Sequence, residues 1–405
     1  MKIKVAKYVS EFLVSHGIRD CFMVTGGGAM HLNDAIGHQE GLHCVFNHHE
    51  QACAIAAEAY TRMTGELAAV CVTSGPGGTN AITGVFGGWV DSIPMFVLSG
   101  QVKRETTAWS CPQLALRQLG DQECDIVKSV SSMTKYAVMV TEPNLISYHL
   151  EKALYLCKHG RGGPVWLDIP LDVQGAEIET EQLRHFHPET GLFWAFPGLS
   201  ENQADTILNK IRTAKSPLLL AGTGIHLGNA EKELLKLIDK LKIPVVTAWN
   251  ANDTVAYENP YFAGMPGTVG TRPGNFALQN CDLLLSLGCR MNIRMIGYNH
   301  FDFAKNAYKI VVDIDERELM KPTIHADMPV HGDVKQFIKM LLNVEYEPPS
   351  HHEKWVNWCH SALEQYPAVL EQYHTLNGKL NPYVFMDVLF QKLNKDDRII
   401  CGNGG

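Results

Sequence analysis

The chain has 405 residues, of which 45% are hydrophobic and 19% are charged, and its formal net charge is −8 at pH 7. These values are ordinary for a globular protein of two or three domains, and the acidic balance makes nucleic acid and anionic membranes poor partners. Eleven cysteines are scattered singly without C-x-x-C spacing, which predicts reduced thiols in a cytoplasmic protein. The sequence predicts neither a signal peptide nor a transmembrane span, because no apolar run approaches about 20 residues.

Helices and strands alternate along the first 170 residues. The predicted strands are short apolar stretches at 20–24, 43–46, 67–73, 95–99 and 165–169. The predicted helices have apolar or small residues at helical spacing and cover 4–17, 51–63, 79–89 and 146–158. Such alternation predicts an α/β fold, a parallel sheet with helices on both faces, in a first domain that spans 1–175.

The remainder predicts a second α/β domain and the beginning of a third. A stretch of looser composition at 176–200 is predicted to be a linker. The second domain spans 201–342, and its predicted strands lie at 217–221, 243–247, 283–287 and 310–314. After a second predicted linker at 343–376, a helix at 381–395 and a strand at 398–401 lead into a glycine-rich end. Residues 377–405 are therefore interpreted as the start of a third domain that continues beyond residue 405.

Three loops of the first domain follow predicted strands. They are Thr25-Gly26-Gly27, the stretch that ends in Glu50, and Ser74-Gly75-Pro76-Gly77. Parallel sheets bind ligands at the carboxyl ends of their strands, and glycine lets the backbone approach a ligand closely. An ordinary strand-to-helix turn explains any one of these loops, and a helix N-terminus explains Glu50 alone. Three such loops together, one with a carboxylate, favour a binding site.

A dinucleotide-binding fingerprint is not present at either glycine-rich stretch. After Gly26 and Gly28, the sixth position is His31 where the fingerprint needs glycine. The stretch from Gly222 to Gly228 is one residue too long. A near-match of this kind is a weak indication of nucleotide binding.

In combination, the motifs resemble those of thiamine-diphosphate enzymes of the acetolactate synthase type, from residue 1 to residue 405. The resemblance is carried in the family's order by His49-Glu50-Gln51, Ser74-Gly75-Pro76-Gly77 with Thr79-Asn80, Asp91-Ser92-Ile93-Pro94, Ser99-Gly100-Gln101-Val102 and Gly162-Gly163-Pro164 with Leu167-Asp168-Ile169-Pro170. It implies a pyrimidine-binding first domain, a middle domain and a pyrophosphate-binding third domain.

The resemblance implies that Glu50 is the catalytic residue, which hydrogen-bonds the aminopyrimidine ring of thiamine diphosphate and so activates the cofactor. A carboxyl group that shares a proton near neutral pH suits a water-poor site, and Phe46 and Ile55 are among the apolar neighbours predicted to wall it. The further contacts to thiamine diphosphate that the resemblance implies are Thr25, Gly26, Gly27, Ser74, Pro76, Asn80 and Gln122.

Three features of the sequence concern the substrates. Gln122-Glu123 resembles a Phe-Gln-Glu motif of the family, but Asp121 stands where the family has phenylalanine. Since that aromatic ring helps to form an apolar acceptor pocket, Asp121 indicates either a polar acceptor or a shifted alignment of this segment. Gly100-Gln101-Val102 stands where pyruvate decarboxylases carry a histidine pair, which favours ligation. His48 is interpreted as a substrate contact or as a packed or solvated histidine.

The second domain resembles the flavin-binding domain of the same group. The resemblance implies FAD contacts from Arg161, Gly222, Gly224, Met265, Gly267, Thr268, Gly288, Arg290, Arg294, Asp313 and Asp333. Arginines and glycine loops suit a pyrophosphate, and a carboxylate at a strand end suits a ribose hydroxyl. The flavin would have a structural role. The alternative is that the domain keeps these residues for folding and binds no flavin.

The function that the resemblance implies is a carboligase. It would decarboxylate a 2-oxo acid, pyruvate first among them, and transfer the two-carbon unit to a second 2-oxo acid or a keto sugar. A 2-oxo acid decarboxylase that releases an aldehyde, and a non-catalytic flavin-binding or regulatory fragment, remain as alternatives. The sequence predicts no metal ligands within the chain, and those for Mg²⁺ are expected beyond residue 405. A homodimer or homotetramer is implied, because the family builds each active site between two subunits.

Overall fold

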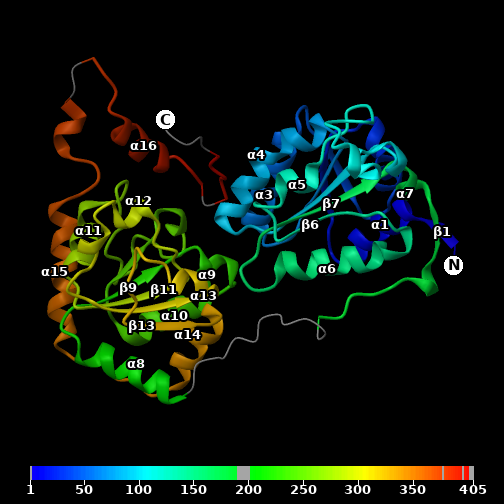
Figure 1. The fold of residues 1–405 in the computed structure, drawn as a ribbon. Coiled ribbons are helices and arrows are strands. Elements are labelled where there is room, and N and C mark those ends of the chain that lie inside the picture. Colours follow the sequence, from blue (N-terminus) through cyan, green and yellow to red (C-terminus); the bar gives the residue numbers. More distant parts are fainter. Residues whose placement is uncertain (1, 189–200, 376–377, 395, 401–405) are drawn as a thin grey trace. The chain divides into compact units, whose positions relative to one another are not determined.

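A computed structural model describes residues 2–188, 201–375, 378–394 and 396–400. The chain forms two compact units, Met1–Ala195 and Phe196–Gly405, which are described separately (Figure 1). Each unit contains a parallel sheet with helices on both faces, so the predicted fold class is confirmed. Within the described ranges, no helix is both long enough and apolar enough to cross a bilayer.

The first unit is built on a six-stranded sheet in which every pair of neighbours is parallel. Its strand order is β3-β2-β4-β5-β7-β6. The strands are β2 (Asp20–Met23), β3 (His43–Phe46), β4 (Ala69–Val72), β5 (Met95–Gln101), β6 (Tyr136–Met139) and β7 (Pro164–Pro170). A separate antiparallel pair joins β1 (Lys2–Lys4) to β8 (Glu177–Glu179).

Two hydrophobic clusters cover the faces of this sheet. One contains apolar residues of α1 (Val5–Ser15), α2 (Met30–Gly37), α6 (Ile146–Lys158) and α7 (Leu171–Gly175). The other contains those of α3 (Glu50–Thr64), α4 (Pro76–Asp91) and α5 (Ile126–Val130). Because the central strands β4, β5 and β7 are buried on both faces, their sequences are almost continuously apolar.

The second unit has a five-stranded parallel sheet in the order β10-β9-β11-β12-β13. The strands are β9 (Pro217–Ala221), β10 (Val245–Thr247), β11 (Leu283–Leu287), β12 (Tyr308–Asp313) and β13 (Met328–His331). One face packs against α8 (Glu201–Thr213), α10 (Glu231–Leu241) and α14 (Val334–Asn343). The other packs against α11 (Arg272–Asn280) and α15 (His352–Gln365). The remaining α-helices are α9 (Gly224–Leu227), α12 (Ile293–Ile296), α13 (Glu316–Leu319) and α16 (Pro382–Phe390).

The structure differs from the sequence predictions mainly after residue 342. The stretch 343–376, predicted as a linker, contains α15, because Trp355 and Cys359 lie one turn apart and are both buried in the core of the second unit. No strand forms at 398–400, where Ile400 is almost fully exposed and no neighbouring strand is available in the described part of the chain. Residues 189–200 of the first predicted linker lie outside the described residues.

Candidate cofactor-binding site

The three loops singled out in the sequence lie at the edge of the first sheet where the carboxyl ends of its strands meet. The strand order reverses between β2 and β4, and such a switch point opens a crevice for ligands. The loop after β2 and the loop after β4 are joined by a hydrogen bond in which Gly28 N–H donates to Thr73 Oγ1 over 3.0 Å.

The glycines of the first loop serve two different purposes. At Gly28, the backbone passes directly over β5, and a Cβ atom built on Gly100 would lie 2.1 Å from the Gly28 carbonyl oxygen. Gly100 therefore permits the loop to pack on the sheet. A Cβ atom on Gly27 would have no heavy atom within 4 Å. The backbone at Gly27 thus remains open to a ligand.

Glu50 is the first residue of α3 and is 9% exposed. Its Oε2 accepts a hydrogen bond of 2.9 Å from Asn80 Nδ2 on α4. Among the residues that the structure describes, Asn80 provides the only hydrogen bond to this carboxylate, so Oε1 is uncommitted. His49, the N-cap, accepts from Gln51 N–H through Nδ1, so the helix start does not depend on Glu50. A buried carboxylate with one fixed and one uncommitted oxygen fits the pyrimidine nitrogen of thiamine diphosphate.

Two of the apolar residues predicted to wall Glu50 are exposed in the part of the chain that the structure describes. Phe46 is 61% exposed and Ile55 is 48% exposed. The inward face of α3 consists instead of smaller residues, namely Cys53, Ala54 and Ala57. Within the chain, Glu50 is therefore enclosed by close contact with α4 rather than by large apolar side chains.

A cavity of about 710 Å³ adjoins these loops. It is lined by Gly27, Gly28 and Ser74 from the two loops and by a segment that begins after β5. That segment contributes the charged side chains of Lys103, Glu105 and Asp121 together with Gln122. The cavity therefore combines the backbone edge of the predicted cofactor loops with a charged wall.

Gln122 is held against the loop that follows β4. Its backbone has φ +57°, which is uncommon for a residue with a side chain. A Cβ atom built on Gly75 would lie 2.1 Å from the Gln122 carbonyl oxygen, so only glycine at 75 allows this approach. The structure thus brings Gln122 to Ser74 and Gly75, although 47 positions separate Gln122 from Gly75 in the sequence.

Glu123 organises the polar segment before it, a role that the sequence did not reveal. Its carboxylate accepts hydrogen bonds from the backbone N–H groups of Ala108, Leu119 and Gly120. The segment has little regular structure apart from short 3₁₀ turns, so this carboxylate replaces the backbone partners that a helix or sheet would supply.

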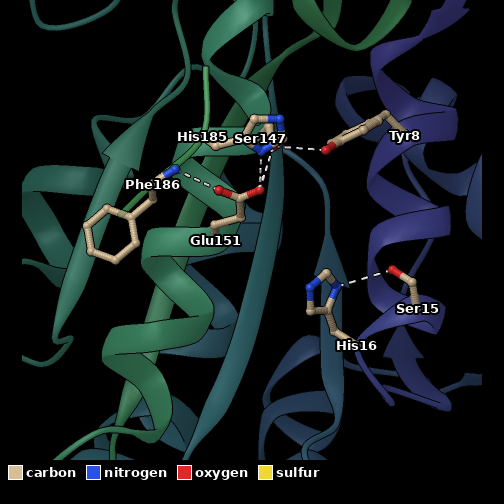
Figure 2. A network of polar contacts seen from close by, with 7 residues as sticks. All are labelled: Tyr8, Ser15, His16, Ser147, Glu151, His185 and Phe186. Atoms are coloured by element: carbon tan, nitrogen blue, oxygen red, sulfur yellow. Dashed lines mark hydrogen bonds and ion pairs between the residues drawn. The ribbon is translucent and has the colours of Figure 1, made fainter. Parts of the chain in front are cut away.

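A serine, a histidine and a glutamate meet elsewhere in the first unit, but they form a structural network (Figure 2). Glu151 accepts from Ser147 Oγ, from Phe186 N–H and from His185, and Ser147 in turn accepts from Tyr8 Oη. Burial alone would raise the pKa of Glu151, but these hydrogen bonds outweigh it and hold the pKa below its ordinary value. His185 approaches both partners through Nδ1, which is not the arrangement of a hydrolytic triad.

In the second unit, the predicted flavin contacts follow the carboxyl ends of its strands. Its strand order also reverses, between β9 and β11. Gly222, after β9, donates its N–H to Leu287 O, and Gly224 donates to Gly288 O, so the two loops touch at this switch point. Asp313 ends β12, and Arg290 follows Gly288 after β11.

A second contact joins the loop 265–268 to α12. Thr268 donates both its N–H and its hydroxyl to Arg294 O, and Asn275 holds both backbone groups of Gly267. Asp333 caps α14 by accepting a hydrogen bond from Gln336 N–H. This capping role accounts for an aspartate at position 333 without any bound ligand. Arg161 lies in the first unit, where its Nε donates to Ser92 Oγ, and its predicted contact with FAD stays a prediction.

His226, beside the Gly222–Gly224 loop, predicts a pH dependence of stability. Its ring bonds Asp253 and Glu231, which outweighs the effect of burial and raises the pKa of His226 to about 9. Because the pKa of His226 is higher in the folded protein, the ion pairs stabilise the fold fully at pH values below the unfolded-state pKa of about 6.5. This stabilisation is lost as the pH rises through the folded-state pKa of about 9. We expect His226→Gln to lower the free energy of unfolding by about 1 kcal/mol at acidic pH, because the carboxylates are partly exposed.

Denaturant unfolding of the parent and of His226→Gln checks this prediction. The two free energies of unfolding should differ at about pH 6 and converge by about pH 10. A difference that is the same at both pH values would show that the ion pairs do not control the effect.

Two sequence families match the chain. Residues 3–129 match the family described as "Thiamine pyrophosphate enzyme, N-terminal TPP binding domain". Residues 204–341 match "Thiamine pyrophosphate enzyme, central domain". The fold of each unit and the loops of the first unit agree with this class of protein.

Individual relatives are similar over most of the chain. The acetolactate synthase large subunit of Cyanidium caldarium is 33% identical over 371 residues, which cover 88% of this chain and 61% of that protein. The large subunit from Buchnera aphidicola subsp. Schizaphis graminum is 30% identical over 99% of this chain and 68% of its own length. Isozyme 3 of Escherichia coli is 29% identical with the same coverage. The chain belongs to the acetolactate synthase-type family of thiamine-diphosphate enzymes, and it spans less than two thirds of the Cyanidium protein.

Proposed function

We propose that the chain contributes the pyrimidine-binding part of a thiamine-diphosphate-dependent carboligase. The enzyme would decarboxylate a 2-oxo acid, pyruvate in the first instance, and transfer the two-carbon unit to an acceptor carbonyl. The observation that carries the proposal is the buried Glu50 carboxylate, with one oxygen fixed by Asn80 and the other uncommitted among the described residues. A glutamate that served only the helix dipole would gain nothing from burial, since an exposed carboxylate interacts with the dipole equally well.

In this proposal, residues of the first unit bind and activate the cofactor. When bound, thiamine diphosphate would supply the nucleophilic carbon that decarboxylation and two-carbon transfer require. Glu50 would hold a proton between Oε1 and the pyrimidine nitrogen N1′, and Asn80 would fix the carboxylate for that exchange. The remaining contacts would be Thr25, Gly26, Gly27, Ser74, Pro76 and Gln122. Mg²⁺ would accompany the cofactor, as the family resemblance implies.

The acceptor side of the proposed site combines charged side chains with apolar ones, which include Val102, Leu119 and Leu171. Asp121, Lys103 and Glu105 line the cavity next to Gln122. Two carboxylates there would repel the carboxylate of a second 2-oxo acid, whereas hydroxyl groups of a keto sugar would find both donors and acceptors. We therefore propose a keto sugar as the acceptor to test first and a second 2-oxo acid as the alternative.

FAD binding by the second unit is also part of the proposal. It is supported by the glycine loops after β9 and β11, which touch at the switch point of the sheet, and by the nearby Arg290 and Asp313. The flavin would be structural, because ligation involves no net redox change. The predicted contacts from Met265, Gly267, Thr268, Arg294 and Arg161 belong to the same proposal.

We further propose that the protein is a cytoplasmic homodimer or homotetramer. Phe46 at the end of β3, Ile55 on α3 and Phe86 on α4 are large apolar side chains that are exposed. A second copy that covered these side chains would keep water away from Glu50.

Mass spectrometry of products from carbon-13-labelled pyruvate tests the function. The protein is incubated with thiamine diphosphate, Mg²⁺ and FAD, first with pyruvate alone and then with a ketohexose as a candidate acceptor. We expect a product in which the labelled two-carbon unit is joined to the acceptor. Free acetaldehyde as the only product would support the decarboxylase alternative. Flavin binding without turnover of a panel of 2-oxo acids would support the non-catalytic one.

A further inference from the structure

A fully buried polar network lies between β5 and β7 of the first unit. Asp168 on β7 is 1% exposed and accepts at both oxygens, from Ser99 Oγ at 2.6 Å and from Gln101 Nε2 at 3.0 Å. Trp166 Nε1 donates to Ser99 Oγ at 2.7 Å. A buried carboxylate is costly unless its hydrogen bonds are complete, and each oxygen of Asp168 has a donor.

Gln101 connects this buried anion to the wall of the cavity. Its Nε2 also donates to Cys124 O at 2.9 Å, and its Oε1 accepts from Val102 N–H at 3.0 Å. Because Asp168 accepts only, it fixes which end of the Gln101 amide is the donor. The amide therefore anchors the backbone immediately after Gln122 and Glu123.

The segment that Gln101 anchors is conformationally strained. A left-handed conformation is unfavourable for a residue with a side chain, and Gln122 has φ +57°. Such a conformation persists only where the surroundings determine it. Glu123 holds the chain before Gln122 through the N–H groups of Leu119 and Gly120, and Gln101 holds the chain after it at Cys124.

We infer that Gln101 and Asp168 are positioning residues that hold the Gly120–Cys124 segment, and with it Asp121 and Gln122, against the loop at Gly75. The catalytic consequence rests on the proposed function. When the segment is no longer held, Asp121 and Gln122 no longer keep a fixed position relative to the loops that would bind the cofactor. The two-carbon unit should then leave as aldehyde more often than it reaches an acceptor. Positioning itself concerns the chain alone and does not require a bound cofactor.

Burial and hydrogen bonding act in opposite directions on the protonation of Asp168. Complete burial raises the pKa of Asp168 to about 7, and nearby Asp125 adds to the increase, while the hydrogen bonds from Ser99 and Gln101 oppose it. A protonated Asp168 would lose one acceptor position, so the network is complete only in the ionised form.

Hydrogen exchange and product partition in Gln101→Met test the inference in the intact protein. Methionine has a similar volume but cannot donate to Asp168 or Cys124 O. We expect the amides of Ala108, Leu119 and Gly120 to exchange at least about tenfold faster than in the parent. We also expect the ratio of ligation product to aldehyde from pyruvate to fall by about tenfold or more, because acceptor positioning is lost. If Gln101→Met does not fold, Gln101→Asn takes its place. Its side chain is shorter than that of glutamine, and we expect the same changes in amide exchange and in product ratio.

Tyr8→Phe is the matched control, because it removes a hydrogen bond of 2.9 Å to Ser147 within the same unit (Figure 2). It should change neither the exchange of the three amides nor the product ratio. Unchanged exchange in both Gln101 variants would overturn the inference, and faster exchange with an unchanged product ratio would overturn its catalytic consequence. If the parent forms no product from pyruvate, the proposed function fails, whereas the exchange rates still decide whether Gln101 positions the segment.

Discussion

Replacement of Glu50 by glutamine should lower the rate of product formation from pyruvate by at least about 100-fold, the range expected for the loss of a general acid–base group. The amide of glutamine can still accept the hydrogen bond from Asn80 Nδ2, so the local structure should persist. It cannot share a proton with a pyrimidine nitrogen. Steady-state turnover and the rate of hydrogen exchange at C2 of bound thiamine diphosphate should fall together, while the affinity for the cofactor changes much less.

Glu58→Gln is a matched control on the same helix. Glu58 forms an ion pair with Arg62 on α3 and lies in none of the proposed contacts. Its replacement should leave turnover within about twofold of the parent, as is usual for surface ion pairs. If Glu50→Gln kept more than a tenth of the parent activity, Glu50 would be a structural residue and the proposed function would lose its main support.

Replacement of Gly100 by alanine should destabilise the first unit by about 3 kcal/mol or more, because overpacking against backbone cannot be relieved by a side-chain rotation. The added Cβ atom would lie 2.1 Å from Gly28 O and 2.6 Å from Ala29 Cα. The loop after β2 would have to lift away from β5. Denaturant unfolding of the first unit should therefore show a lower midpoint, and cofactor affinity should fall with it.

Gly87→Ala separates this effect from a general intolerance of alanine. A Cβ atom on Gly87 would have no heavy atom within 4 Å, and Gly87 lies inside α4. Alanine there should leave stability unchanged or raise it by up to about 1 kcal/mol, through its higher helix propensity. Equal stability of the Gly100→Ala protein and the parent would show that the loop at Gly28 can move to accommodate the added Cβ atom with little loss of free energy.

The alternation of strands and helices was predictable from sequence because buried parallel strands such as β4 are continuous apolar runs. Helix α2 was harder to recognise, since only Leu32 and Ile36 of its eight residues form the buried stripe. Helix α15 was missed although Trp355, Cys359 and Ala362 have helical spacing, because neighbouring prolines and charges favoured a linker.

The order of the motifs pointed to the cofactor loops, but their contacts depend on the three-dimensional structure. The pairing of Asp168 with Gln101 joins residues 67 positions apart, and neither side chain is unusual in its local sequence. The three backbone hydrogen bonds to Glu123 have no local pattern either, because they hold an irregular segment. The exposure of Phe46 and Ile55 was not predictable from an apolar sequence that is equally compatible with a core and with an interface.

The hydrogen bonds from the backbone N–H groups of Ala108, Leu119 and Gly120 to the Glu123 carboxylate have a consequence for the evolution of such a protein. The bonds are made to backbone N–H groups, so they constrain the path of the segment but hardly restrict its side chains. Substitutions between positions 109 and 121 can then accumulate while the catalytic frame stays in place. Gly120 is an exception, because a Cβ atom there would lie 2.7 Å from Thr106 O. A lineage could in this way acquire a new substrate range through a few exchanges in one surface segment, with little cost to folding.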